Sequence, residues 1–337
     1  MKLQNRFIRS ATAEFVANDY DGTITKEYHS LYSNLALGEI GLIIQGHLYV
    51  MDEGKAHKHM AGIAHDTHIT GLKQITKLVH EADTENLIAA QLNHGGAYSV
   101  STKTASPRED EEIIVMSEED IENVIEGFRK AALRAKKAGY DAIQIHSAHG
   151  YLLRQFLSNK TNKRTDSWGG SLENRAQFLL SVYQAIRSVV GSNYPVLVKM
   201  NGSDDPSEGF TVEEGSKVAS WLANEGLDAI EISGMRSTRT VKPEKEAYFS
   251  PTARIIKQHI GDMPLILVGG LRSLAQMQEL REEFVDFISM CRPFIREPNL
   301  VQKFKSGKKR SDCISCNKCY KARNISKCLE KNSSTSD

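Results

Sequence analysis

The feature that most constrains the fold is a short apolar segment that recurs between amphipathic stretches. Residues 139–146 read Gly-Tyr-Asp-Ala-Ile-Gln-Ile-His, and residues 226–233 read Gly-Leu-Asp-Ala-Ile-Glu-Ile-Ser. A looser copy, Phe-Val-Asp-Phe-Ile-Ser-Met, occupies 284–290. Each copy begins where a helical pattern stops, in the first two cases at a glycine, and runs into a buried strand. This junction is typical of a repeating helix–strand unit.

The segment 117–139 shows why helices are expected between the strands. Ser117 can cap a helix and Asp120 can occupy its third position, while Gly139 can supply a left-handed stop. One apolar stripe follows the helical period: Ile121, Val124, Ile125, Phe128 and Leu133. Similar patterns predict helices near 26–37, 68–83, 173–190, 211–225, 251–259 and 273–282, and Ser273 is a potential cap for the last.

Eight short apolar runs lie between these helices. They occupy 6–10, 41–45, 86–92, 142–146, 196–200, 229–233, 265–268 and 287–290. Strands that alternate with helices predict a parallel sheet, and eight such units predict an α/β protein with a closed (β/α)8 TIM barrel. An open doubly wound sheet is the alternative fold. We expect the barrel to span 1–305 and a short Cys-rich C-terminal extension to span 306–337.

The charge balance indicates a small-molecule substrate. Lys and Arg number 43 against 42 Asp and Glu, so the chain has no basic excess for nucleic acid or an anionic membrane. No stretch approaches the ~20 apolar residues of a membrane span, and the first residues lack the apolar core of a signal peptide. We therefore expect a cytoplasmic protein.

Two long loops, 93–117 and 147–172, follow the third and fourth predicted strands at the end where barrel enzymes build their sites. His146 and His149 leave the fourth strand and can converge on one carbonyl oxygen, each donating an N–H. Tyr151 can then protonate the carbon next to that carbonyl. A structural pair bonded to backbone and a two-histidine metal site are the alternatives.

Other polar groups follow later strands at the same end of the predicted barrel. Gly269, Gly270 and Arg292 follow strands seven and eight, where backbone N–H groups and a guanidinium can bind phosphate. Gln91 and Lys199 stand where apolar residues are expected, and they can meet the polar edge and the N1–C2=O region of a flavin pyrimidine. A tight turn and an internal salt bridge are the corresponding structural alternatives.

One long motif carries a family resemblance. Residues 146–158 read His-Ser-Ala-His-Gly-Tyr-Leu-Leu-Arg-Gln-Phe-Leu-Ser, followed by Asn162, Arg164, Asp166 and Gly-Gly-Ser-Leu-Glu-Asn-Arg at 169–175. This closely resembles the Old Yellow Enzyme family of NADH:flavin oxidoreductases, especially its branch containing the barrel domain of bacterial 2,4-dienoyl-CoA reductase. The resemblance runs from residue 5 to about residue 328.

The resemblance implies that the 1–305 barrel binds FMN and implies a role for each matching residue. His146 and His149 look like the substrate-orienting pair, and Tyr151 looks like the proton donor. The implied FMN-binding residues are Ala11, Thr12, Ala13, Gly46, Gln91, Lys199, Ser233, Gly234, Gly269, Gly270, Cys291 and Arg292. Lys199 stands where relatives commonly have Arg, which keeps the charge and loses the forked geometry. Ala13 stands where relatives often have a Cys or Thr that tunes the flavin potential, so the redox potential does not transfer.

The implied reaction is that of an ene-reductase. NADH or NADPH reduces FMN, and an α,β-unsaturated carbonyl compound then receives hydride at its activated C=C bond. A homodimer is the default oligomer. A flavoenzyme that modifies RNA, such as a dihydrouridine synthase, is a competing function on the same fold, but the near-neutral charge and the histidine pair disfavour it.

Four of the five cysteines are crowded near the C-terminus. Cys313, Cys316, Cys319 and Cys328 have the density of a four-thiolate site for an iron–sulfur cluster or zinc. The resemblance favours a [4Fe-4S] cluster, with structural zinc or a vestigial tail as alternatives. A separate electron-carrier protein could then reduce the FMN, and an FMN/iron–sulfur electron-transfer protein is the alternative function.

Overall fold

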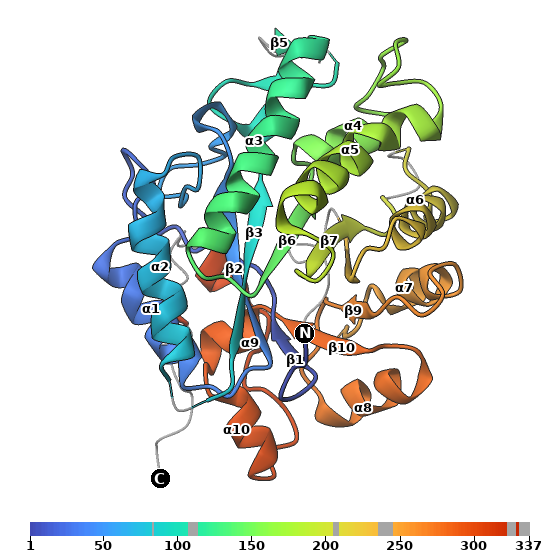
Figure 1. Cartoon of the computed structure of the whole chain (residues 1–337). Helices are drawn as coiled ribbons and strands as arrows, with labels where there is room; N and C mark the ends of the chain where they lie inside the picture. The colour runs from blue at the N-terminus through green and yellow to red at the C-terminus, as the bar shows by residue number, and fades with distance from the viewer. Residues whose placement is uncertain (83, 107–113, 205–208, 235–244, 322–327, 330–337) are drawn as a thin grey trace.

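The computed structural model describes residues 1–82, 84–106, 114–204, 209–234, 245–321 and 328–329. Eight strands close into a barrel in the neighbour order β1-β10-β9-β8-β7-β6-β3-β2, and every neighbouring pair is parallel (Figure 1). These strands are β1 (Phe7–Arg9), β2 (Leu42–Tyr49), β3 (Leu87–Asn93), β6 (Ala142–Ser147), β7 (Val196–Asn201), β8 (Ala229–Ser233), β9 (Leu265–Leu267) and β10 (Phe287–Met290). Each predicted apolar run is one of them, so the (β/α)8 barrel is confirmed and the open sheet is wrong.

The predicted helices are confirmed and pack around the outside of the barrel (Figure 1). They are α1 (Lys26–Ala36), α2 (Thr67–His80), α3 (Glu118–Lys137), α5 (Leu172–Val190), α6 (Val212–Asn224), α7 (Ser250–Lys257) and α8 (Leu274–Glu283). Three short helices end the described chain: α9 (Arg292–Arg296), α10 (Leu300–Lys305) and α11 (Lys318–Lys321). No helix in the described ranges is both long and apolar enough to cross a membrane.

The two long loops contain small elements that the sequence pattern did not reveal. The pair β4 (Lys103–Thr104) and β5 (Ile114–Val115) and the turn η2 (Gly96–Tyr98) lie in the loop after β3. Helix α4 (Leu152–Leu157) lies in the loop after β6, and a further turn, η1 (Asp52–Gly54), follows β2. Each element is shorter than the window over which hydrophobic periodicity is measured.

The interior of the barrel is layered along the strand direction. An apolar layer consists of Ile8, Leu42, Ile44, Ala89, Ala142, Leu197, Ala229 and Ile266. Because alternate strand residues share a face, the next interior positions toward the carboxyl ends follow by steps of two. They form a polar layer with Gln91, Gln144, Lys199 and Glu231, all 3 % exposed or less. The polar layer thus lies between the apolar layer and the mouth of the barrel, which is the opening at the carboxyl ends of the strands.

A β-bulge disturbs β2 at the mouth of the barrel. The register between β2 and β3 shifts between Gln45 and Leu48, so Gly46 and His47 lie in the irregular step. A Cβ on Gly46 would overlap the carboxylate of Glu14 and the carbonyl of Thr12, so only glycine fits without movement. Bulges redirect side chains at barrel rims, and here the irregular step includes His47.

The helix caps differ in one respect from expectation. Ser117 and Asp120 form a capping box on α3, and Thr211 and Glu214 form the same arrangement on α6. Ser273 occupies the N-cap position of α8, but its side chain makes no capping bond. Its backbone is instead bridged to Arg310 in the C-terminal segment, which sequence reasoning could not see.

We expect Ser117→Ala to lower the free energy of unfolding by about 1 kcal/mol, because the change removes the side chain that caps α3. Ser273→Ala is the matched control and should cost less than half as much, since no side-chain cap is lost there. Urea unfolding followed by circular dichroism measures both. Equal losses in the two variants would contradict this assignment.

Candidate active site

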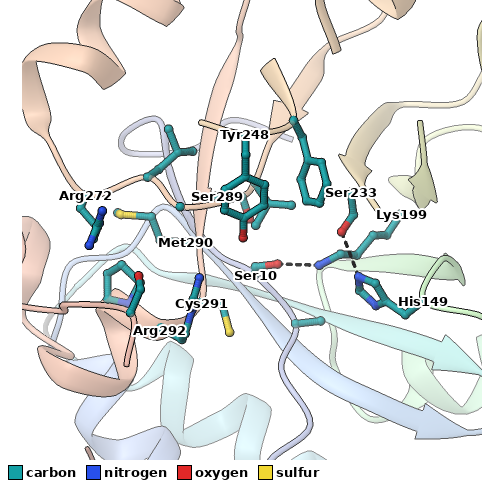
Figure 2. A pocket seen from close by; sticks show the side chains of 18 of the residues that line it. Ser10, His149, Lys199, Ser233, Tyr248, Arg272, Ser289, Met290, Cys291 and Arg292 are labelled. Carbon is teal, nitrogen blue, oxygen red and sulfur yellow. Dashed lines mark hydrogen bonds between the residues drawn. The ribbon is translucent and has the colours of Figure 1, made fainter. Parts of the chain in front are cut away.

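A cavity lies at the carboxyl ends of the barrel strands, where the loops after β6, β8, β9 and β10 meet the segment after β1 (Figure 2). Eight predicted site residues line it: Ala11, His149, Lys199, Ser233, Gly269, Gly270, Cys291 and Arg292. Thr12, Ala13, Gly46, Gln91, Gly234, His146 and Tyr151 are not part of its wall. The structure therefore brings residues from six different strand ends to one place.

One end of the cavity is built from glycines and cationic side chains. Gly269 and Gly270 have φ values of +118° and +71°, and a Cβ on either would lie less than 3 Å from the Tyr248 ring. Arg272 and Arg292 line the same wall, with Arg292 donating from Nη1 to Asn317 Oδ1 at 2.7 Å. Bare backbone and guanidinium groups around one space suit a phosphate group.

The C-terminal segment completes this end of the cavity. Ser315 and Tyr320 belong to its wall, although both lie beyond the barrel in sequence. The Tyr320 hydroxyl is 3.0 Å from Cys291 Sγ, and Cys291 Sγ is 2.8 Å from the hydroxyl of Thr12. Cys291 thus connects the tail to the loop after β1.

The other end of the cavity rests on the polar layer. Lys199 Nζ donates to the Ser10 hydroxyl at 2.7 Å and lies 3.4 Å from the carboxylate of Glu231 (Figure 2 shows the first contact). The internal salt bridge considered for Lys199 therefore exists. Its ammonium group still lies at the cavity wall, so the ion pair and a role toward a ligand are compatible.

The imidazoles of His146 and His149 lie next to each other at the mouth. Their ring centroids are 5.1 Å apart with an edge-to-face angle of 88°, and the Tyr151 ring is 5.0 Å from His146. Burial, together with the neighbouring His149, His47 and Lys199, holds the pKa of His146 well below its usual value. Burial and Lys199 lower the pKa of His149 to about 3. Both rings are therefore neutral near pH 7.

The hydrogen bonds restrict which ring nitrogen of His146 carries the proton. Its Nδ1 accepts the backbone N–H of Ala148 at 3.2 Å, so in the neutral ring the proton lies on Nε2. His149 adopts a left-handed backbone with φ +59°, and its N–H donates to Asn201 Oδ1 at 3.2 Å. Its Nε2 is 2.9 Å from the Ser233 hydroxyl. The backbone after β6 thus contacts the His146 ring, and Ser233 at the end of β8 contacts the His149 ring.

Sequence reasoning missed a third histidine at this site. The ring of His47 lies 5.2 Å from Tyr151 and 5.9 Å from His146. Its Nδ1 is 2.9 Å from the Asn93 amide, and its Nε2 is 3.2 Å from Nε2 of His57. The predicted strand stopped at residue 45, so the bulge that sets the direction of His47 had no signature in the pattern.

Sequence reasoning also missed Glu231, although a signal for it was present. The repeats align Ile-Gln-Ile at 143–145 with Ile-Glu-Ile at 230–232, which places Gln144 and Glu231 at equivalent positions. The structure joins the two side chains by a 2.8 Å hydrogen bond. Equivalent interior positions of a barrel lie at the same level, so the repeat could have predicted this pair.

The four tail cysteines meet around a second, smaller cavity. Cys313, Cys316, Cys319 and Cys328 all line it, and Arg292 lines both cavities. Every cysteine is a free thiol, and burial raises the pKa of Cys319 to about 11. In the part of the chain that the structure describes, no three His, Cys, Asp or Glu side chains are placed to hold a metal ion.

A parallel eight-stranded barrel with a phosphate-suited cavity at its strand ends defines a barrel enzyme with a phosphate-bearing cofactor. The model of the NADH:flavin oxidoreductase / NADH oxidase family matches residues 1–311, and the chain belongs to this family. It is an Old Yellow Enzyme-like oxidoreductase that uses FMN and NAD(P)H.

The relatives agree with this assignment. The chain is 33 % identical over 303 residues to an NADPH dehydrogenase of Halalkalibacterium halodurans, covering 88 % of each chain. It is 31 % identical over 315 residues to an NADPH dehydrogenase of Bacillus subtilis, covering 88 % of this chain and 89 % of the relative.

Solved structures show the same fold. An old yellow enzyme homologue from Zymomonas mobilis superimposes with a TM-score of 0.78 at 25 % identity, covering 93 % of this chain and 92 % of that one. A morphinone reductase variant in complex with tetrahydroNAD gives 0.76 at 26 % identity, covering 92 % and 88 %. A 2-naphthoyl-CoA reductase gives 0.88 at 24 % identity over 97 % of this chain, which spans only 54 % of that protein.

The buried neutral histidines predict an acid-sensitive fold. Burial lowers the pKa of His94 to about 3, whereas the unfolded chain binds a proton at about 6.5. The stability from His94 is therefore fully present above pH ~6.5 and is lost as the pH falls toward 3. We expect His94→Asn, which keeps an acceptor for the Gly96 N–H, to reduce the loss of stability between pH 7 and pH 5 by about 2 kcal/mol in urea unfolding.

His80 provides the control of opposite sign. Its hydrogen bond to Asp141 raises the pKa of His80, so its contribution is present at low pH and is lost as the pH rises through the folded value. His80→Asn should make the loss of stability below pH 7 steeper. A His94→Asn variant with the wild-type pH dependence would contradict the prediction.

Proposed function

We propose that the protein is an ene-reductase that transfers hydride from NAD(P)H, through FMN, to the activated C=C bond of an α,β-unsaturated carbonyl compound. The observation that carries this proposal is the pair of neutral imidazoles of His146, which is buried, and His149, which is partly buried, beside Tyr151 at the mouth of an FMN-family barrel. The NADPH dehydrogenase relatives support the choice of reductant.

The residues of the cavity suit FMN in one orientation. Gly269, Gly270 and Arg292 would hold the phosphate, because a close backbone approach and a guanidinium meet there. Lys199 and Gln91, in the polar layer, would hold the pyrimidine end. When bound, FMN supplies the hydride chemistry of the reaction.

The two histidines act on the substrate oxygen. His146 carries its proton on Nε2 because Nδ1 accepts a backbone N–H, so Nε2–H is the group that can donate. His149 is fixed by Ser233 and by the Asn201 contact to its backbone. Donors held in place before the reaction stabilise negative charge as it develops on the oxygen, without reorganisation.

Tyr151 provides the proton for the neighbouring carbon. Burial raises the pKa of Tyr151 to about 12, which keeps its hydroxyl protonated near pH 7. Its ring lies against both His146 and His47, so it shares the mouth with the oxygen-binding pair. Each turnover then consumes one NAD(P)H and one proton and converts the C=C bond into a single bond.

We expect His149→Ala to lower the rate of alkene reduction by on the order of a hundredfold, because one donor to the developing oxyanion is lost. Stopped-flow absorbance separates FMN reduction by NADPH from FMN reoxidation by cyclohexenone, and only the second step should slow. FMN content should match the wild type. The surface variant His29→Asn is the control, and equal oxidation rates in all three proteins would refute the role of the pair.

The cysteine tail supports a second proposal, a [4Fe-4S] cluster that exchanges electrons with FMN. All four thiols line one cavity, and Arg292 forms part of both this cavity and the larger one. Thiols are the donor type that an iron–sulfur cluster or zinc requires, and these four would have to converge further to bind one, because no three of them are placed to hold a metal in the described ranges. A separate electron carrier, a homodimer and a cytoplasmic location stay predictions.

Metal analysis of protein purified without oxygen tests the tail. We expect about four iron and four sulfide per chain, in line with a [4Fe-4S] stoichiometry, and loss of both in Cys313→Ser combined with Cys316→Ser. Cys291→Ser is the matched control, because Cys291 does not line the cysteine cavity, and should retain them. Zinc in place of iron, or no metal at all, would contradict the proposal of a [4Fe-4S] cluster.

A further inference from the structure

We propose that Glu231 is a positioning residue that fixes the hydrogen-bonding polarity of Gln91 and so selects which edge of the flavin pyrimidine the site accepts. This inference rests on the FMN placement proposed above. It starts from two side chains that the mechanism does not use, Gln144 and Glu231. Both are 0 % exposed and lie inside the barrel, where an unpaired polar group would be costly.

Four donors converge on the Glu231 carboxylate. Ser10 and Ser289 donate their hydroxyls to Oε1 at 2.7 and 2.8 Å, and Lys199 Nζ lies 3.4 Å from the same oxygen. Gln144 Nε2 donates to Oε2 at 2.8 Å. All four contacts come from donors, so Glu231 acts here only as a hydrogen-bond acceptor.

This acceptor-only group sets the direction of a chain of amides. Gln144 must turn its NH2 toward Glu231, so it turns its carbonyl oxygen toward Gln91. Gln91 must then turn its own NH2 toward Gln144, and the bond from Nε2 to Oε1 measures 2.7 Å. The reverse orientation would place two donors or two acceptors face to face.

Gln91 belongs to the polar layer and not to the cavity wall, so in the FMN placement proposed above its carbonyl oxygen and its remaining N–H would be the groups offered to the pyrimidine. The flavin pyrimidine has one N–H, at N3, flanked by two carbonyl oxygens. An amide with a free acceptor and one free donor matches N3–H and an adjacent carbonyl. If the Gln91 amide could flip freely, it would offer two N–H donors about as often as one acceptor and one donor. The site would then no longer distinguish the N3–H edge of the flavin from other edges.

The same carboxylate also sets the charge under the pyrimidine. Lys199 and Glu231 are a buried pair with side chains 4 % and 0 % exposed. Removal of the negative member leaves the ammonium uncompensated beside the ligand. Reduced FMN carries more negative charge on the pyrimidine than oxidised FMN, so the change should favour binding of the reduced form.

Two variants separate the effect of hydrogen-bond direction in the amide chain from the effect of the Glu231 charge. Gln144→Met interrupts the amide chain and leaves the Lys199–Glu231 pair in place. Glu231→Gln removes the negative charge and frees the direction of the chain. Glu297→Gln is the matched control, since Glu297 is another buried carboxylate, paired with Lys303 and Lys308 and outside both cavities.

The experiment uses the full chain with FMN removed and titrates it with FMN or with FMN methylated at N3, following flavin fluorescence. Wild type and Glu297→Gln should lose affinity on methylation. In Gln144→Met and Glu231→Gln, methylation at N3 should reduce FMN affinity roughly fivefold to tenfold less than it does in the wild type. The reason is that the acceptor for N3–H is no longer fixed in these variants. Steric effects of the methyl group cancel in this comparison.

Spectroelectrochemistry of bound FMN gives the second readout. Glu231→Gln should bind reduced FMN about tenfold more tightly relative to oxidised FMN, which raises a two-electron potential by about 30 mV. Gln144→Met should leave the potential within error of the wild type. Circular dichroism and thermal unfolding confirm that each variant is folded.

Equal discrimination against the N3-methyl group in all four proteins would overturn the inference, as would a Glu231→Gln potential that is unchanged or lowered. Neither result involves an alkene, so the proposed ene-reductase activity could survive both. Conversely, a wild type that binds FMN and discriminates as expected but does not reduce enones would refute the proposed function alone.

Discussion

The arrangement of the barrel mouth depends on one buried carboxylate, Glu231. A charge inside a barrel is expensive, and a buried ion pair rarely repays the loss of hydration by Coulomb attraction alone. Here the cost is offset by two hydroxyls, an amide and the Lys199 ammonium, which together satisfy both oxygens. Replacement of this layer by leucine and isoleucine could give a stable barrel but would leave no polar surface for a cofactor.

A second buried carboxylate organises the other side of the mouth. Glu14 accepts hydrogen bonds from Arg9, Tyr32 and the backbone of Gly46, the last at 3.0 Å. This network holds the loop after β1 against the bulge in β2, which includes His47. The polar layer and the Glu14 network meet at Ser10 and Arg9, which are adjacent in sequence. The position of the His47 imidazole therefore follows from polar contacts inside the barrel as well as from the loops above it.

The alternation of elements was predictable because it depends on local physics. Helical periodicity, caps such as Ser117 and glycine stops predicted the seven main helices, and the apolar runs predicted the eight strands. The convergence of His149, Lys199, Gly269 and Arg292 on one cavity follows from a general property of parallel barrels, whose strand ends share one face. His47 and the contact of the C-terminal segment with the cavity were not predicted, because each depends on pairing between distant segments. Glu231 was missed although the repeat places it at the position equivalent to Gln144.

The sequence by itself determined the barrel, the end of it that carries the site, and the chemical types of group gathered there. Only the tertiary structure decided how those groups are held: His146 kept neutral by burial, His149 bonded to Ser233, Lys199 paired with Glu231, and four cysteines around one cavity. The physical reason is that periodicity and capping act within one or two turns of chain. Protonation state, hydrogen-bond direction and ligand geometry are set instead by burial and by partners that lie tens of residues away.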